Sequence, residues 1–356
     1  MKQVDTILLS FVIMTRNDDY QGNAKWRLEM TLQFLAHNLQ RIGKLDRCEI
    51  LVVDWQSAVP LHEVLVLSDE ARSITRFVCA TPDSTGHLRF ACDFPRPVIL
   101  NIGIRRALGS YIVQTLGDVL WTTEALSGLF DVILGNSPCC GYDVKQTLLV
   151  FGRREIPYEV ASASPTVEAL TEYMQHYPKD TIPPDCHPYL LVPGDSLMMH
   201  RDLWHATRGF DERLVHWGWN DCDLILRMKL MYHVVSCRDL PWLTVYHLNH
   251  IAPQEMEQVM QRPNNPWLFN DVTVNDEAWG LGGLSFPEYY DNRCMSAAIA
   301  TPPAPPVYVS FFRLRHILNL LLFYIRNLKK TRNRCFVYGC IKHIIYQHFK
   351  KTITVS

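Results

Sequence analysis

Several sequence features that mark common protein classes are missing from this chain of 356 residues. No Cys-x-x-Cys pair occurs among the 11 cysteines, so the cysteines do not indicate a zinc site. No Gly-x-Gly-x-x-Gly follows the first apolar run, which disfavours a dinucleotide-dependent oxidoreductase. The N-terminus enters that apolar run without a signal peptide, so we expect a cytoplasmic location and reduced thiols.

Acidic residues are missing from residue 301 onward. That part holds ten of the 35 Lys and Arg residues, whereas residues 1–300 carry 25 basic against 36 acidic side chains. Its longest apolar stretch is far shorter than the about 20 residues that a membrane span needs. We expect 301–356 to be a Pro-rich linker and a basic amphipathic helical tail that binds an anionic membrane surface through 311–351, at the inner face of the membrane. The alternative is a helix packed on the main domain or on another subunit.

The length and the ordinary apolar content predict one large α/β domain. Residues 6–14 and 49–53 are short apolar runs, which predicts two strands buried on both faces, as in a parallel sheet. Between them, residues 26–42 have helical spacing and stop at Gly43. In such a βαβ unit the site lies at the carboxyl ends of the strands. The polar residues at these two ends are Thr15, Arg16, Asn17 and Asp54.

A second informative region covers residues 94–122. Its pattern predicts a helix over 98–108 that ends at Gly109, then a strand over 111–115, then a turn that holds Asp118. Further along the chain, residues 245–250 end an apolar strand with two histidines, His247 and His250.

Residues 209–224 (GFDERLVHWGWNDCDL) are the most informative segment. Trp217 and Trp219 flank a glycine, which suits an aromatic platform for a sugar ring. Asp221 and Asp223 follow at the start of an amphipathic run, where a carboxylate is well placed as a general base. The alternative is a tryptophan pair in the core followed by an N-capping aspartate.

This segment resembles the C-terminal half of the β-1,4-galactosyltransferase catalytic domain and related family-2-like glycosyltransferases of GT-A fold. The resemblance implies a Rossmann-like catalytic domain over 1–255, with a mostly parallel sheet flanked by helices. A lid or loop region over 256–300 and the tail over 301–356 would follow it. The resemblance also implies that Asp221 is the base that deprotonates the acceptor hydroxyl. Asn220 stands where these enzymes usually carry a glutamate.

The resemblance implies further site residues in three groups. The implied nucleotide contacts are Thr15, Arg16, Asn17, Asp54, Arg96, Asn101 and Arg105. The implied acceptor or sugar contacts are Gly194, Asp195, Trp217, Trp219, Asn220 and Asp223. The implied ligands of Mn²⁺ or Mg²⁺ are Asp118, His247 and His250. Simpler alternatives are a helix N-cap for Asp54 and a solvated helix face for Arg105.

The function implied is that of an inverting glycosyltransferase in polysaccharide biosynthesis. It would move a sugar from a nucleotide-sugar, by resemblance a UDP-sugar, to a hydroxyl of a glycan or lipid-linked acceptor, without nucleic acid as a partner. Two alternatives stay open. One is a nucleotidyltransferase, and the other is a degenerate GT-A domain that binds a glycan or a partner. Leu116 and Asn220, each in place of an acid, favour the degenerate domain.

Overall fold

The computed structural model describes residues 7–176, 196–229, 232–236, 239–251, 265, 274–291 and 293–295. The tail expected over 301–356 lies outside these described residues, and so do the candidate site residues Gly194 and Asp195. Within the described part of the chain, no helix combines the length and the apolar character that crossing a membrane requires.

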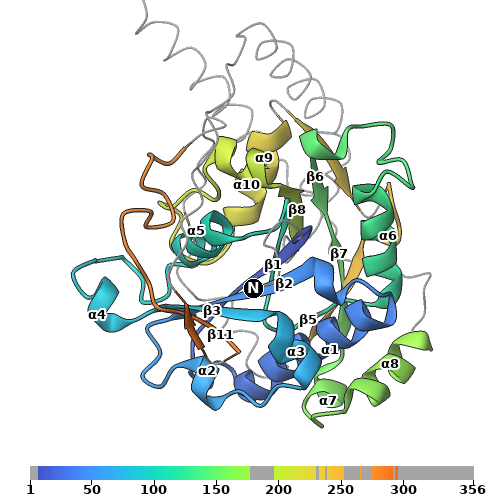
Figure 1. The fold of residues 1–356 in the computed structure, drawn as a ribbon, viewed down its shortest axis with the longest axis horizontal. Coiled ribbons are helices and arrows are strands. Elements are labelled where there is room, and N and C mark those ends of the chain that lie inside the picture. The colour runs from blue at the N-terminus through green and yellow to red at the C-terminus, as the bar shows by residue number, and fades with distance from the viewer. Residues whose placement is uncertain are drawn as a thin grey trace, which may run out of the picture.

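Strands and helices alternate along most of the described chain (Figure 1). The strands are β1 (Leu9–Thr15), β2 (Cys48–Trp55), β3 (Thr75–Ala80), β4 (Tyr111–Thr115), β5 (Val119–Leu120), β6 (Thr147–Val150), β7 (Gly152–Ile156), β8 (Leu197–His200), β9 (His233–Ser236), β10 (Thr244–Leu248), β11 (Glu288–Tyr290) and β12 (Arg293–Met295). The α-helices are α1 (Ala24–Arg41), α2 (Leu61–Val64), α3 (Asp69–Ile74), α4 (Pro82–Thr85), α5 (Arg96–Arg106), α6 (Thr123–Ile133), α7 (Tyr158–Ala161), α8 (Val167–Gln175), α9 (Arg201–Thr207) and α10 (Asn220–Lys229). Two short 3-10 turns, η2 (Leu45–Arg47) and η3 (Val144–Gln146), precede β2 and β6.

The main sheet has a parallel centre, β3-β2-β1-β4, with antiparallel pairs on both sides of it and a further parallel pair, β6–β9, at one edge. Nine strands of the described chain form it, in the order β12-β11-β3-β2-β1-β4-β8-β6-β9. The pairs β3–β2, β2–β1 and β1–β4 are parallel, whereas β8 and β11 pair antiparallel with their neighbours. The expected α/β fold with a mostly parallel central sheet flanked by helices is therefore confirmed, and the antiparallel pairs are those of β8 and β11 with their neighbours.

Helices cover both faces of this sheet. Successive side chains of a strand point to opposite faces, so Phe11 and Ile13 of β1 pack in the core that includes α1, α3 and α6. Val12 and Met14 point the other way and pack in the core that includes α5, α9 and α10. Because both faces are buried, β1 and β2 are apolar along nearly their whole length, as the sequence predicts.

A smaller sheet stands beside the main one and carries part of the candidate site. Its strand order is β5-β10-β7, with β10 antiparallel to β5 and parallel to β7. In this register His247 of β10 lies opposite Val119 of β5 and opposite Glu155 of β7. Strands that are far apart in the sequence thus meet next to Asp118.

The helices and the strand expected between residues 26 and 115 are present, but Gly109 has a different role from the expected one. The helix expected over 26–42 is α1, and the strand expected over 111–115 is β4. The helix expected over 98–108 is α5, but it ends at Arg106 because Ala107 is already extended. Gly109 therefore does not stop the helix. It lies against β1, where an added Cβ would come within 2.6 Å of the backbone nitrogen of Ser10.

The described part of the segment expected to form a lid contacts the body of the protein closely. Arg106 donates hydrogen bonds to the carbonyl oxygens of Gly280, Leu281 and Leu284. After that, β11 pairs with β3 and extends the main sheet. Residues 274–291 are thus attached to α5 and to the edge of the sheet.

Candidate active site

The carboxyl ends of the central parallel strands bring several predicted site residues to one edge of the sheet. Thr15 at the end of β1 lies directly opposite Asp54 near the end of β2. Asp118 follows the neighbouring strand β4 in a turn, three residues after Thr115. Because parallel strands end at the same edge, the site expected there from the sequence has a structural basis.

Asp118, His247 and His250 form a cluster whose ligand atoms lie within 4.8 Å of one another. Asp118 Oδ2 is 3.1 Å from His250 Nε2 and 3.6 Å from His247 Nε2. The short β5–β10 ladder holds the cluster together, since the amide of Leu248 also donates to the carbonyl oxygen of Asp118 at 2.8 Å. The three residues predicted as metal ligands are therefore neighbours in the fold.

Glu155 completes this cluster from the adjacent strand. Its Oε2 is 2.7 Å from Nδ1 of His247. Burial alone lowers the pKa of His247, but the carboxylates of Asp118 and Glu155 outweigh burial and raise that pKa to about 10. Burial likewise raises the pKa of Asp118, and the two histidines outweigh it and bring that pKa well below its usual value. The electrostatic balance of the cluster therefore favours the ionised forms of Asp118 and His247.

The cluster fits a divalent cation in three respects. Asp118 Oδ1 is buried and has no hydrogen-bond partner among the described residues, although buried polar atoms usually have one. Glu155 accepts the Nδ1 proton of His247, which leaves Nε2 as the ligand atom, as in many metal sites. Ligand atoms about 2.1 Å from one ion are about 3.0 to 3.4 Å apart at octahedral or tetrahedral angles, close to the two separations from Asp118.

The loop after β1 connects this cluster to the end of β2. Asn17 donates from its backbone to Ser57 Oγ at 2.7 Å and from its side chain to the carbonyl oxygen of Val59 at 2.8 Å. Three residues later, the ring of Tyr20 meets the ring of His250 edge-on, with centroids 5.9 Å apart. The predicted nucleotide residues of this loop thus lie between the β2 turn and the cluster of Asp118, His247 and His250, which is called the metal cluster below for its proposed role.

Two arginines lie in or near the same region. Arg16 pairs with Asp18 at 2.7 Å, and its guanidinium lies 5.6 Å from the ring centroid of Phe94. Arg96 opens α5, two residues after Phe94, and is partly exposed. Both side chains are therefore accessible to an anionic ligand at this edge of the protein.

Asp54 has a structural role in its own turn. The carboxylate is 2% exposed, and its two oxygens accept hydrogen bonds from the Ser57 hydroxyl and from the backbone nitrogen of Leu61. Burial raises the pKa of Asp54, and these two hydrogen bonds partly oppose that change. The contact between Asp54 and a nucleotide base stays a prediction.

The Trp-Gly-Trp segment forms a tight loop before α10. Gly218 and Trp219 both have positive φ, at 77° and 66°. The indole of Trp217 is 39% exposed, which suits a contact surface better than a core position. The alternative of a buried tryptophan pair therefore does not hold for Trp217.

Asn265 fastens this loop from a distant part of the chain. Its Oδ1 accepts from the amide of His216 at 2.7 Å. Its Nδ2 lies 2.6 Å from the carbonyl oxygen of His216, 2.5 Å from that of Gly218 and 2.6 Å from Asn220 Oδ1. Its backbone nitrogen donates to the carbonyl oxygen of Trp217 at 3.0 Å. With a side chain only 4% exposed, Asn265 sets the shape of the loop.

The two carboxylates after this loop have different surroundings. Asp221 is the second residue of α10 and is partly exposed. The start of a helix favours the ionised form of a carboxylate, which is the form that accepts a proton. Asp223 is buried and pairs with Arg227, one helical turn later, at 2.7 Å. Asp223 therefore has a structural role, while its sugar contact stays a prediction.

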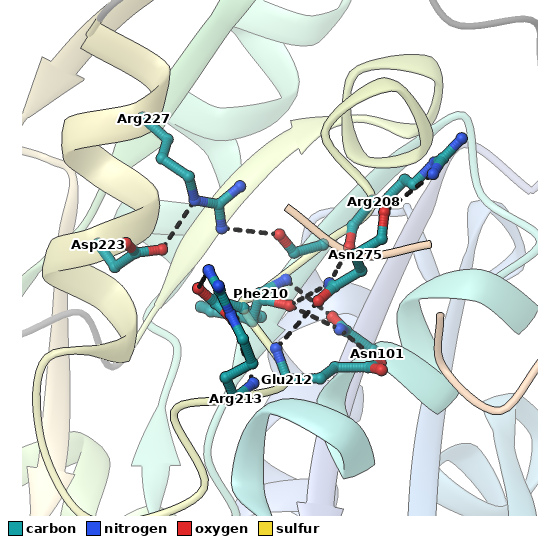
Figure 2. A network of polar contacts seen from close by, with 10 residues as sticks. Asn101, Arg208, Phe210, Glu212, Arg213, Asp223, Arg227 and Asn275 are labelled. Atoms are coloured by element: carbon teal, nitrogen blue, oxygen red, sulfur yellow. Dashed lines mark hydrogen bonds and ion pairs between the residues drawn. The ribbon is translucent and has the colours of Figure 1, made fainter. Parts of the chain in front are cut away.

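Figure 2 shows that Asn101 belongs to a buried network around residues 209–212. Its Nδ2 donates to the carbonyl oxygen of Phe210 at 2.9 Å, and its Oδ1 accepts from the amide of Phe210 at 2.9 Å. Gly209 has a φ of 68°, and an added Cβ there would lie 2.1 Å from Asn101 Oδ1. Asn101 thus fixes the start of the segment that leads to Trp217.

Arg105, the next predicted nucleotide residue on α5, also bonds to the protein backbone. Its guanidinium donates to the carbonyl oxygens of Glu277 and Trp279 at 2.7 and 2.8 Å. The side chain is 7% exposed, so the solvated helix face considered for it is not found. Nucleotide contacts of Asn101 and Arg105 stay predictions, but both side chains hold neighbouring segments in place.

Sequence reasoning missed Glu155 and Asn265. Glu155 lies 92 positions from His247, and only the β7–β10 register brings the two together. Asn265 lies between 45 and 49 positions from its partners in the tryptophan loop. An acidic residue within a partly buried strand was an available signal for Glu155, whereas no local pattern marks Asn265.

No protein-family model matches the sequence, and no curated protein sequence matches it. The fold is similar to solved structures of glycosyltransferases. S. aureus TarS 1-349 matches with a TM-score of 0.44 and 13% identity, over 71% of this chain and 63% of that chain. This chain therefore spans less than two thirds of that structure's chain.

Two further structures show the same kind of similarity. S. aureus TarS 1-349 in complex with UDP-GlcNAc matches with a TM-score of 0.44 and 10% identity, over 96% of this chain and 73% of that chain. A mutant of Drosophila beta-1,4-galactosyltransferase 7 in complex with manganese, UDP-Gal and xylobiose matches with a TM-score of 0.36 and 12% identity, over 76% of this chain and 82% of that chain. These structures belong to the class of enzymes that the sequence resembles, and the similarity is one of fold.

Proposed function

We propose that this chain is a metal-assisted, inverting glycosyltransferase that takes a sugar from a nucleotide-sugar donor, most simply a UDP-sugar. The observation that carries the proposal is the cluster of Asp118, His247 and His250 beside the loop after β1. This cluster lies at the carboxyl edge of the central parallel strands, where α/β proteins bind nucleotides.

In this proposal the cluster of Asp118, His247 and His250 acts on the nucleotide-sugar donor. Asp118, His247 and His250 would hold a divalent cation, which would neutralise the negative charge that develops on the leaving nucleoside diphosphate. Glu155 keeps His247 in the tautomer and orientation that a ligand requires. The guanidinium groups of Arg16 and Arg96 supply additional positive charge for the diphosphate at the same edge.

In this proposal Asp221 acts on the acceptor molecule. Its carboxylate takes the proton from the acceptor hydroxyl while the hydroxyl oxygen forms a bond to the anomeric carbon of the donor sugar. The bond from that carbon to the diphosphate oxygen breaks on the opposite face, so the configuration inverts. The exposed indole of Trp217 supports the acceptor ring, and Asn220 offers its amide for hydroxyl contacts.

The acceptor we propose is a growing glycan, free or lipid-linked, as in polysaccharide biosynthesis. In this proposal the basic residues of 311–351 hold the enzyme at an anionic membrane surface at the inner face of the membrane. Addition of vesicles that contain anionic lipids, compared with neutral vesicles, tests this part separately from the chemistry.

The proposal is tested by following nucleoside diphosphate release from UDP-, GDP- and dTDP-sugars with Mn²⁺, with and without a polysaccharide acceptor. We expect one donor to be turned over by the wild type and by Glu159→Gln, an exposed control on α7. Asp221→Asn should lose about 10²- to 10⁴-fold in rate, the usual contribution of a general base. Equal rates for Asp221→Asn and Glu159→Gln would rule out Asp221 as the base.

A further inference from the structure

A cavity of about 300 Å³ lies apart from the metal cluster, between α1, α6, α8 and the small sheet. Figure 1 shows α1, α6 and α8 gathered around β5 and β7 on one side of the molecule. Side chains from all three helices line the cavity, among them Phe34 of α1, Thr123 of α6 and Thr171 of α8. The size is near the lower end of the range for small-molecule sites, which begins at about 300 Å³.

The cavity and the metal cluster lie on opposite faces of the same two strands. Arg154 of β7 and Tyr246 of β10 line the cavity. Their strand neighbours Glu155 and His247 are bonded to each other on the cluster side. Because successive side chains of a strand point to opposite faces, the two sites are separated by the sheet itself. A ligand in the cavity therefore leaves the cluster accessible.

Aromatic side chains form one part of the cavity wall. They are Phe34, Trp242 and Tyr246, from α1, the segment before β10, and β10. The indole of Trp242 packs directly on α6 at Gly128, where an added Cβ would lie 2.5 Å from the ring. The hydroxyl of Tyr246 accepts a long hydrogen bond from Arg154 at 3.4 Å. Phe34 is only 1% exposed and Tyr246 only 7%, whereas Trp242 is partly exposed, so the indole of Trp242 is the ring that can offer its face to a ligand.

Polar side chains of several kinds form the remainder. Thr122 and Thr123 at the start of α6 contribute hydroxyls, and Gln175 at the end of α8 contributes an amide. Glu124 adds a negative charge, and Arg41 and Arg154 add positive charges. The indole face of Trp242 together with hydroxyl, amide and charged groups of both signs matches a neutral polyhydroxylated ring, which has apolar C–H faces and hydroxyls that donate and accept.

We propose that this cavity is a second saccharide-binding site, which holds a short segment of a neutral glycan on the far side of the small sheet from the metal cluster. The site goes beyond the proposed transfer reaction, and its binding requires neither a metal ion nor a nucleotide. For an enzyme that acts on a polymer, such a site raises the local concentration of acceptor chains near the reacting site.

The proposal is tested by saturation-transfer NMR with three disaccharides, xylobiose, maltose and N,N′-diacetylchitobiose, in the presence of EDTA. Thr171→Trp fills the cavity from α8, and Gln175→Trp narrows it from an exposed position that does not disturb the core. Glu172→Trp adds the same ring at an exposed position on the same helix and serves as the matched control. Circular dichroism confirms that each variant is folded.

We expect at least one disaccharide to bind the wild type, Glu172→Trp and Asp118→Asn with equal affinity. The same disaccharide should bind Gln175→Trp and Thr171→Trp at least about tenfold more weakly. Binding that survives in folded Gln175→Trp and Thr171→Trp would overturn the proposal, as would the absence of binding to the wild type. Loss of binding only in Asp118→Asn would place the sugar at the cluster and would also overturn it. Because EDTA removes the metal, failure here leaves the transferase test unaffected.

Discussion

Glu155 Oε2 lies 2.7 Å from Nδ1 of His247, at paired positions of the parallel strands β7 and β10. This contact fixes which nitrogen of the imidazole is available for a metal ion. The carboxylates of Asp118 and Glu155 also raise the pKa of His247, so a proton on this ring competes with a cation. When a cation binds, that proton must leave.

Replacing Glu155 by glutamine is expected to weaken metal binding. Glu155→Gln keeps an oxygen acceptor at the same distance but removes the charge that orients and polarises His247. Loss of such a supporting contact costs about 10- to 100-fold in metal affinity. Titration of Mn²⁺ with detection of the free ion by electron paramagnetic resonance measures this, with Glu159→Gln as the control. An unchanged dissociation constant would show that Glu155 does not support the site.

The ligand set is expected to prefer Mn²⁺ over Mg²⁺. Mg²⁺ binds oxygen ligands almost exclusively, whereas two of the three proposed protein ligands, His247 and His250, are imidazoles. We expect Mn²⁺ to bind at least about tenfold more tightly than Mg²⁺. His250→Asp replaces one imidazole by a carboxylate and should narrow this preference. Competition of Mg²⁺ against bound Mn²⁺ provides the measurement, and equal affinities in the wild type would contradict the assignment of His247 and His250 as ligands.

Removing the Asn265 side chain is expected to loosen the tryptophan loop. Asn265→Ala deletes the acceptor for the His216 amide and the donor shared by three oxygens, each hydrogen bond contributing about 1 kcal/mol. Hydrogen exchange of the amides at 216–220 should accelerate, while exchange in β1 and β2 stays as in the wild type. Asn136→Ala, at an exposed turn, is the control. Unchanged exchange at His216 in Asn265→Ala would sink this account of the loop.

Stability is expected to fall with decreasing pH because of His205. Burial, and then the charges of Arg201 and Arg105, lower the pKa of His205 to about 4, whereas an unfolded histidine titrates near about 6.5. Between these values the unfolded chain binds the proton and the folded protein does not. The free energy of unfolding should therefore decrease by about 3 kcal/mol between pH 7 and pH 4 on account of this residue.

His205→Leu tests this dependence through its slope. The variant should lose part of the pH dependence of the denaturant midpoint between pH 6.5 and pH 4. His37→Leu, at an exposed histidine of α1, should keep the wild-type slope. Parallel curves for all three proteins would mean that His205 does not control acid stability.

The central strands and α1 could be predicted because their patterns are local. β1 and β2 are continuous apolar runs buried on both faces, and α1 repeats its leucines at helical spacing. Asp118, His247 and His250 were predicted as metal ligands by resemblance, and the structure places the three side chains together, while their role as ligands stays a prediction. The start of α10 next to Asp221 was also expected, from the amphipathic run that follows it.

Contacts between distant segments could not be predicted in the same way. Asn101 and Arg105 carry polar groups on α5, and nothing local indicates that these groups bind the backbone near 210 and 277–279 instead of a ligand. Asp223 has the same spacing from Asp221 whether it contacts a sugar or Arg227. Such choices depend on which segment covers each side chain, and that is decided by the tertiary arrangement.

The most direct test of the proposed donor site is calorimetric titration of UDP into the wild type and into Asp118→Asn, each with Mn²⁺ and with EDTA. We predict that UDP binds the wild type only with Mn²⁺. Asp118→Asn should remain folded and lose most of this affinity for UDP. Binding of UDP that is equal with Mn²⁺ and with EDTA, or equal in Asp118→Asn, would contradict a donor site built on this cluster.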